Sequence, residues 1–228
     1  MKVIDFQPVC IDKHNRAFFI RVEPENLKST LTDIINILSN LSWISRFDEE
    51  YIRESFEART QDTIEDIHSK LMSTSCDPIS SDAGEYVVSE LAREAIVHKM
   101  GYLDIPLAEL YNKKKSGNPG FDFHSQTPDH TIIFGEAKYL STKNAYGTGL
   151  RQVVNFITER KDLKDIIDLR YFCSAEALTN ASKGVKGFAI AFSAKETPSE
   201  QLIRNIAQNT DFEEILQYQE IIMVAVNL

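Results

Sequence analysis

Cysteine is scarce in this chain, and long apolar runs are missing from it. The 228 residues include three cysteines, Cys10, Cys76 and Cys173, and no two of them form a C-x-x-C pair. This odd, widely spaced set argues against a disulfide framework and against a zinc site. No stretch approaches the roughly 18 consecutive apolar residues of a membrane helix, and Asp5 stands where a secretory signal would be apolar. We therefore expect a globular cytoplasmic protein with no membrane partner.

Basic residues are also in the minority. Lys and Arg number 25 against 34 Asp and Glu, for a net charge of −9. Residues 1–110 carry a net −9 and residues 196–228 a net −5, whereas residues 111–195 carry a net +5. Surfaces that bind nucleic acid are usually basic, so only the middle region suits phosphate, although its triplet Lys113-Lys114-Lys115 is also typical of a solvated loop. The acidic remainder should repel DNA, so strong binding would need a partner.

The spacing of apolar residues predicts an α/β protein. Two short strands, at 3–10 and 17–22, precede amphipathic helices at 27–41 and 48–71. The polar run from Ser73 to Pro78 predicts a boundary between an N-terminal hairpin and helical region, 1–77, and a core with a C-terminal α/β extension, 78–228. Within the core, the pattern predicts strands near 122 and at 131–140, 188–192 and 221–226, and helices at 82–100, 150–160, 163–178 and 199–207. This order indicates a sheet of at least four strands flanked by helices.

The chemistry is concentrated between Gly120-Phe121-Asp122-Phe123 and Phe134-Gly135-Glu136-Ala137-Lys138. Residues two apart in a strand point to the same face, so Glu136 and Lys138 should project together. Asp122 would reach the same point if the two strands pair antiparallel. Two converging carboxylates form a hard-oxygen site that suits Mg²⁺ or Mn²⁺. A lysine beside them could orient or deprotonate a water, or stabilise charge on a phosphate.

A Glu-x-Lys pair alone is weak evidence, because the chain contains a second copy, Glu159-Arg160-Lys161. That copy lies near the end of a predicted helix, where residues two apart do not face each other, and we interpret it as surface. The first copy interrupts an apolar run, and charges seldom enter buried strands unless they are paired or bound to metal. The alternative is a strand end at which Glu136 and Lys138 are merely paired or solvated.

Asp122, followed after thirteen intervening residues by Glu136-Ala137-Lys138, is similar to the signature of the PD-(D/E)XK, or restriction-endonuclease-like, nucleases. The resemblance covers roughly residues 82–195 and implies a mixed sheet flanked by helices, with Asp122, Glu136 and Lys138 as catalytic residues. It also implies a magnesium-dependent deoxyribonuclease in which Asp122 and Glu136 hold the metal. The chain departs from the signature at one position, because Phe121 stands where the proline would precede the aspartate.

Flanking residues extend this resemblance. Many of these nucleases carry a glutamate on the helix before the aspartate strand, which Glu85 matches as a metal ligand, with Glu90 as second choice. Glu85 also suits the start of a helix as an acid favoured by the helix dipole. A glutamine on the following helix is matched by Gln152, which could otherwise be an exposed polar residue. His124 and His130 bracket the loop between the strands and could approach the metal or the phosphate, or simply be solvated.

The acidic N-terminal portion, the Gly-Glu-x-Lys motif and the small C-terminal extension together resemble the HamA family, the nuclease-like subunits of Hachiman anti-phage defence systems. This resemblance implies an effector that works with a helicase subunit, HamB, which would supply the affinity for DNA. A catalytically inactive nuclease-fold subunit that binds a protein partner is the alternative. A stand-alone restriction enzyme is disfavoured, because the chain has little basic surface for reading a DNA sequence.

Overall fold

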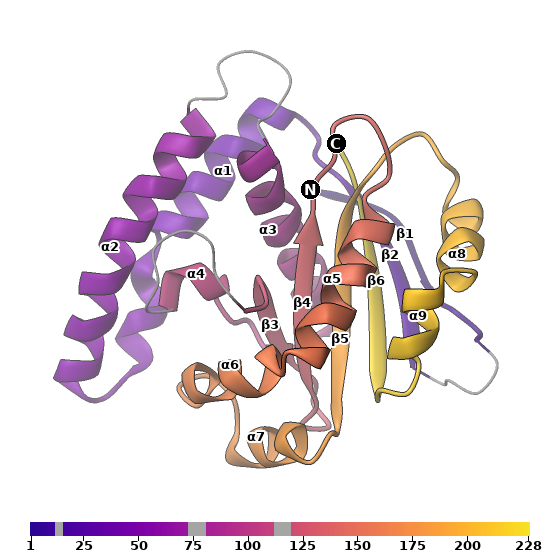
Figure 1. Cartoon of the computed structure of the whole chain (residues 1–228). Coiled ribbons are helices and arrows are strands. Elements are labelled where there is room, and N and C mark those ends of the chain that lie inside the picture. Colours follow the sequence, from indigo (N-terminus) through magenta and orange to yellow (C-terminus); the bar gives the residue numbers. More distant parts are fainter. Residues whose placement is uncertain (12–15, 73–80, 112–119) are drawn as a thin grey trace.

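The computed structural model describes residues 1–11, 16–72, 81–111 and 120–228 (Figure 1). The N-terminal part contains β1 (Lys2–Pro8), β2 (Ala17–Glu23), α1 (Leu27–Ser39), the 3-10 helix η1 (Leu41–Arg46) and α2 (Glu50–Met72). The middle part contains α3 (Ser81–Met100), α4 (Ala108–Tyr111), β3 (Phe123–Gln126), β4 (Ile132–Lys138) and α5 (Tyr146–Thr158). The C-terminal part contains α6 (Lys161–Leu169), α7 (Ala175–Ser182), β5 (Lys186–Ala194), α8 (Ser199–Ala207), α9 (Thr210–Ile215) and β6 (Glu220–Asn227).

In the described part of the chain, six strands form one mixed sheet in the order β1-β2-β6-β5-β4-β3. The central strands β2, β6, β5 and β4 pair in parallel, whereas β1 and β3 pair antiparallel at the two edges. β4, β5 and β6 are buried along almost their whole length, as parallel strands are when helices cover both faces. The predicted α/β class, with a mixed sheet flanked by helices, is confirmed.

Two hydrophobic layers enclose this sheet. On one face lies α3, which contributes Val87, Val88 and Leu91, with α1 and α2 outside it. On the other face lie α5 to α9, and α5 crosses the front of β4 and β5 in Figure 1. Because successive strand residues point to opposite faces, Phe134 packs under α5 while its neighbour Ile133 packs under α3. None of the described helices combines the length and apolar content needed to cross a membrane.

The N-terminal hairpin belongs to the same sheet as the rest of the chain. β2 pairs with β6 in parallel, from Ala17 opposite Ile221 to Val22 opposite Val226. β1 and β2 therefore extend the predicted sheet of at least four strands to six. The boundary predicted between residues 77 and 78 lies outside the described residues, as does Cys76, while Cys10 and Cys173 are free thiols.

Two helices differ from the sequence-based expectation. α5 begins at Tyr146 rather than Leu150. Gly149 in its first turn lets the helix lie close to the sheet, since a Cβ there would lie 3.0 Å from Ile190. The segment predicted as one helix at 163–178 is divided into α6 and α7. Ser174 caps the second of these, since its hydroxyl accepts a hydrogen bond from the Ala177 amide and so satisfies a free N–H group of the first turn.

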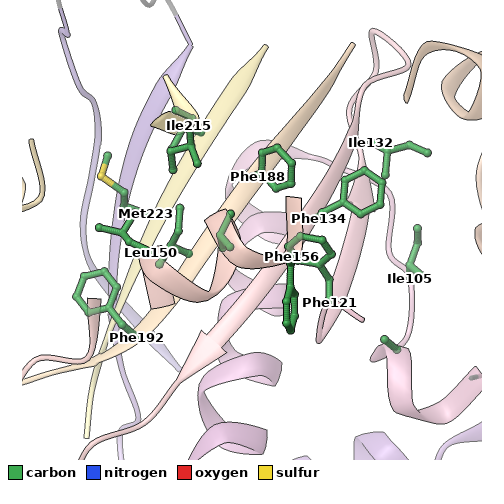
Figure 2. Packing of buried hydrophobic residues seen from close by; sticks show 14 of the residues in the cluster. Ile105, Phe121, Ile132, Phe134, Leu150, Phe156, Phe188, Phe192, Ile215 and Met223 are labelled. Carbon is green, nitrogen blue, oxygen red and sulfur yellow. The ribbon is translucent and has the colours of Figure 1, made fainter. Parts of the chain in front are cut away.

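Aromatic rings fill the layer between α5 and the sheet. Figure 2 shows Phe156 of α5 beside Phe121, with Phe134 and Phe188 on the neighbouring strands. The ring centroid of Phe121 lies 5.3 Å from the centroid of Phe156, 5.4 Å from that of Phe134 and 5.7 Å from that of Phe188. These separations are typical of favourable ring pairs. Phe121 therefore anchors the residue next to Asp122 in the core, at the position where the nuclease signature has proline.

We expect Gly135→Ala to destabilise the protein by about 1–3 kcal/mol, the usual range for overpacking a core. A Cβ at this position would lie 2.2 Å from the buried ring of Phe123 on the paired strand, so the ring or the strand must move. Urea unfolding would measure the loss. Gly147→Ala is the matched control, because its Cβ would meet nothing closer than 3.9 Å. Equal stability of both variants would contradict the packing seen here.

Candidate active site

β4 extends beyond the end of β3, and this difference in length creates the site. β3 pairs with β4 only from Gln126 opposite Ile132 to Phe123 opposite Gly135. One further backbone bond is donated by the Asp122 amide to the Gly135 carbonyl, at 2.9 Å. Past Gly135, β4 has β5 on one side, and no strand of the described residues pairs with its other side. Glu136 and Lys138 lie on this open stretch.

Asp122 is placed at the point where β3 begins rather than within the strand. The predicted antiparallel pairing is observed, and it brings the Asp122 carboxylate alongside β4. Its Oδ2 accepts a hydrogen bond from the Ala137 amide at 2.8 Å. The carboxylate therefore satisfies a backbone N–H group that the missing length of β3 would otherwise have paired. This bond fixes Asp122 next to the Glu-x-Lys stretch.

Lys138 joins two acids from different elements. Its Nζ lies 3.0 Å from Oε1 of Glu136 and 3.2 Å from Oε1 of Glu85 on α3. The predicted projection of Glu136 and Lys138 to one side of β4 is thus observed, and Glu85 reaches the same point from the covering helix. The side chain of Glu136 is 1% exposed, against 13% for Lys138 and 37% for Glu85. The site thus runs from a buried carboxylate to a solvent-facing one.

The Glu136 carboxylate is buried without full hydrogen bonding. Among the described residues, neither Oε1 nor Oε2 accepts a well-directed hydrogen bond. Oε1 has only the ion-pair contact with the Lys138 ammonium. Buried polar atoms are nearly always satisfied. Oε2 has no partner among the described residues, so part of the desolvation cost of this carboxylate is left uncompensated. Such an atom indicates a position arranged for a positively charged group.

The pKa values follow from burial and from the surplus of acids. Burial raises the pKa of Asp122 to about 7, against the opposing effect of the Lys138 ammonium. Burial and the Asp122 charge raise the pKa of Glu136 well above its usual range. Burial would lower the pKa of Lys138, but Glu136, Asp122 and Glu85 outweigh it and raise that pKa, so the ammonium stays charged. Clustered acids with displaced pKa values are characteristic of functional sites.

A further acid near this site, Glu109 of α4, was not among the predicted site residues. The preceding residue, Ala108, donates its amide to the Asp122 carbonyl at 2.9 Å, which ties α4 to the site. Burial raises the pKa of Glu109, and its Oε2 is buried without a hydrogen-bond partner among the described residues. The only available signal was an acid inside the apolar run Leu107-Ala108-Glu109-Leu110-Tyr111. The charge of Glu109 helps to raise the pKa of Asp122, while Tyr86 and Lys70 oppose the effect of burial on the pKa of Glu109 itself.

The donor set fits Mg²⁺ or Mn²⁺ in its chemistry, because carboxylate oxygens are the ligands these ions prefer. In the described residues no three His, Cys, Asp or Glu side chains converge into a ready-made metal site. The reason lies in two contacts. The Lys138 ammonium stands against both Glu136 and Glu85, and one oxygen of Asp122 faces the Ala137 amide. Metal binding would require the lysine to move from the buried carboxylate.

Gln152 and Glu90, both predicted from the residues that flank the motif, differ in how they lie relative to the site. Gln152 is half-buried on α5, three residues after Gly149, whose Cβ would lie 3.7 Å from Lys138 Cγ. Residues three apart share a side of a helix, so Gln152 is on the side of α5 that faces β4, although no hydrogen bond links it to the acids within the described residues. Glu90 is turned elsewhere: both its oxygens bind Arg93, at 2.5 and 2.9 Å.

The two histidines are engaged in structural contacts. His124 lies in β3 and is fully buried, with Nδ1 2.7 Å from the Tyr111 hydroxyl and Nε2 3.3 Å from Asp165 Oδ2. It is therefore a core residue rather than the loop residue that the sequence suggested. His130 adopts a positive φ of 56° in the turn before β4, and its Nδ1 lies 3.0 Å from the Ser174 hydroxyl.

The second Glu-x-Lys copy lies at the junction of α5 and α6. Glu159 is on the surface as predicted, but Lys161 is only 16% exposed. The prediction that the two residues do not face each other is wrong, because α5 ends and α6 begins at this point. Glu159 is 58% exposed and pairs with Lys161 at 3.3 Å. The Lys161 ammonium also lies 3.8 Å from the centre of the Phe156 ring, which is a typical cation–π contact. This copy has no further carboxylate beside it in the described structure. The triplet Lys113-Lys114-Lys115 lies outside the described residues.

The chain was compared with family models, curated proteins and solved structures, and none of the three comparisons gives a match.

We expect the stability of the metal-free protein to fall as pH rises from about 4 to about 7, that is, from the unfolded-state to the folded-state pKa of Asp122. A carboxyl group with a raised folded-state pKa contributes stability below its unfolded pKa and loses it as pH passes the folded value, here about 7 for Asp122. Asp122→Asn should remove part of this loss, on the order of 2–4 kcal/mol at about 1.4 kcal/mol per pKa unit. Urea unfolding at several pH values would measure it. Exposed Asp33→Asn is the control, and parallel slopes for Asp122→Asn and wild type would contradict the burial of Asp122.

Proposed function

We propose that this protein is a magnesium-dependent DNA endonuclease of the PD-(D/E)XK type. The proposal includes a restriction-endonuclease-like core built from α3, β3, β4, α5 and β5. The observation that carries it is the cluster of Asp122, Glu136 and Lys138 at the open edge of β4, with Glu136 buried and incompletely hydrogen-bonded. A structural ion pair would not require a buried, unsatisfied carboxylate beside a second buried acid.

In this proposal each residue has a distinct task. Asp122, Glu136 and Glu85 would hold the metal, with Glu109 adding negative charge near it. When bound, Mg²⁺ or Mn²⁺ supplies Lewis acidity toward the phosphodiester. The Lys138 ammonium, held charged by its acidic neighbours, would donate hydrogen bonds to the phosphate and stabilise negative charge that develops there. Gln152 would help to position the attacking water from α5.

We further propose that the nuclease is the effector subunit of a HamA-like anti-phage defence complex with a helicase. Support comes from the charge distribution. The whole chain has a net charge of −9, whereas residues 111–195, which contain Asp122, Glu136 and Lys138, have a net charge of +5. Affinity for DNA depends strongly on the number of phosphates neutralised. A helicase subunit that binds the DNA would compensate for the acidic remainder and deliver the strand to the site.

One observation favours a second candidate, an inactive nuclease-fold subunit that serves as a protein-binding module. The described acids do not converge into a ready metal site, because Lys138 lies between Glu85 and Glu136. A protein that had lost catalysis could keep this ion-paired cluster as a structural element. Metal binding and cleavage separate the two candidates.

We expect the protein to nick plasmid DNA with Mg²⁺, in the presence of its helicase if not alone. Glu136→Gln and Lys138→Met should each reduce cleavage at least about 100-fold, the usual scale for removing a group that acts in the chemical step. Glu159→Gln and Lys161→Met are matched controls, because they alter the second copy of the same motif.

Equal nicking by wild type, Glu136→Gln and Lys138→Met would rule out this active site. Absence of cleavage by the wild type, with the helicase present and Mg²⁺ or Mn²⁺ supplied, would favour the binding module.

Metal binding should respond in opposite directions to two substitutions. Glu136→Gln removes a buried ligand, so Mn²⁺ affinity should fall at least tenfold. Lys138→Met removes the ammonium that competes for Glu136 and Glu85, so Mn²⁺ affinity should rise several-fold while cleavage is lost. Isothermal titration calorimetry would measure both, with Lys161→Met as the control. A fall in affinity for Lys138→Met would contradict the competition between lysine and metal.

A further inference from the structure

A cavity separate from the acidic site lies between the C-terminal end of α1, η1, α3 and the segment 103–110. Its volume is about 440 Å³, within the range of sites that bind small molecules. Leu38, Leu107 and Leu110 form apolar walls, and Trp43 contributes an aromatic one. The cavity contains none of the residues assigned to catalysis.

Trp43 is held rigidly and has an unused donor. Its ring centroid lies 5.4 Å from Phe56 and 5.8 Å from Phe172, so neighbouring rings fix its orientation. Its indole Nε1–H is buried and donates to no acceptor in the described structure. Indole N–H groups usually find a partner when buried. Because this N–H is closed to solvent, Trp43 contributes an aromatic wall to the cavity rather than a hydrogen bond to a ligand.

Arg46 provides an unpaired positive charge at the same cavity. Its guanidinium lies 4.7 Å from the centre of the Phe172 ring, but it forms no ion pair with any described residue. Burial lowers its pKa, and Asp104 only partly opposes this effect. The guanidinium of this exposed residue, which has Asp104 near it but no ion pair with it, favours a carboxylate, because a carboxylate matches its planar donor geometry.

Arg93 adds a second guanidinium to the cavity, and its positive charge is already paired with two acids, Glu90 and Asp104. Two of its nitrogens bind the buried Glu90 carboxylate, at 2.9 and 2.5 Å. Its remaining nitrogen contacts Asp104, whose side chain is 64% exposed. Glu90 is fixed by burial, whereas Asp104 is a solvent-facing partner that another anion could replace. Because Glu90 and Asp104 together balance the two arginines, the cavity accommodates one negative charge in place of Asp104 rather than two.

We propose that this cavity binds a small apolar monoanion, an aliphatic or aromatic body with one carboxylate, which displaces Asp104 to lie between Arg46 and Arg93. The leucine walls and Trp43 would cover the apolar body. A doubly charged phosphate ester suits the cavity less, because the buried Glu90 charge would repel its second charge. The proposal is independent of the nuclease assignment, since it uses none of Asp122, Glu136 or Lys138.

Trp43 is the only tryptophan of the chain, so its fluorescence reports directly on this cavity. Decanoate should change the emission saturably, and uncharged 1-decanol should bind at least tenfold more weakly. Arg46→Gln should weaken decanoate at least tenfold and leave 1-decanol within twofold. Asp104→Asn should strengthen decanoate several-fold, because it removes the competing carboxylate without disturbing the walls. Thermal unfolding of each variant would establish that it is folded.

Arg170→Gln is the matched control, because the Arg170 guanidinium also lies over a ring, 4.6 Å from the centre of Tyr171, but does not line the cavity. It should leave decanoate binding unchanged. The proposal is overturned if decanoate causes no saturable change, or if Arg46→Gln weakens decanoate and 1-decanol equally. It is also overturned if Asp104→Asn weakens decanoate binding in a folded protein.

Discussion

The burial of the Glu136 carboxylate within an apolar strand is the constraint on which the site depends. A charge in this position is costly unless a cation compensates it, and the Lys138 ammonium does so on one side only. The cost is carried by the packing of β4, which is covered by α3 on one face and α5 on the other. The rigid sheet therefore holds the acid in an environment it would not adopt in a loop.

The unequal lengths of β3 and β4 explain why the acids of the candidate site gather at the end of β4. A longer β3 would pair with the backbone at Ala137 and cover the approach to the acids. Instead the Asp122 carboxylate takes that N–H group, and Glu85 reaches Lys138 from α3. A strand end thus becomes a place where side chains from a helix, two strands and α4 meet. Binding sites commonly lie at such positions, because the scaffold is rigid and the backbone is exposed.

α3 connects the two candidate sites of this protein. Near its start it provides Glu85 to the acidic cluster, and over the next two turns or so it provides Glu90 and then Arg93 to the cavity. The segment 103–110 has a similar double role, since Ala108 binds the Asp122 carbonyl while Leu107 and Leu110 line the cavity. The two sites therefore share rigid elements even though they share no residue.

The sequence by itself determined the strands, most helices and the central residues of the candidate site. Asp122, Glu136 and Lys138 lie close together in the chain, and the two-residue period of a strand is enough to place Glu136 beside Lys138. Their interruption of an apolar run also marks them as unusual without any knowledge of the fold. Local periodicity predicts such features because it depends on backbone geometry alone.

Only the tertiary structure decided which distant acids join them. Glu85 and Lys138 are 53 residues apart, so no local pattern pairs them, whereas the contact of Glu90 with Arg93 follows from their spacing of three residues on α3. Glu109 reaches the site through the bond from Ala108 to Asp122, and His124 is buried because β3 places it under Tyr111 and Asp165. These outcomes depend on how helices pack against the sheet, and that packing is the result of the whole core rather than of any one segment.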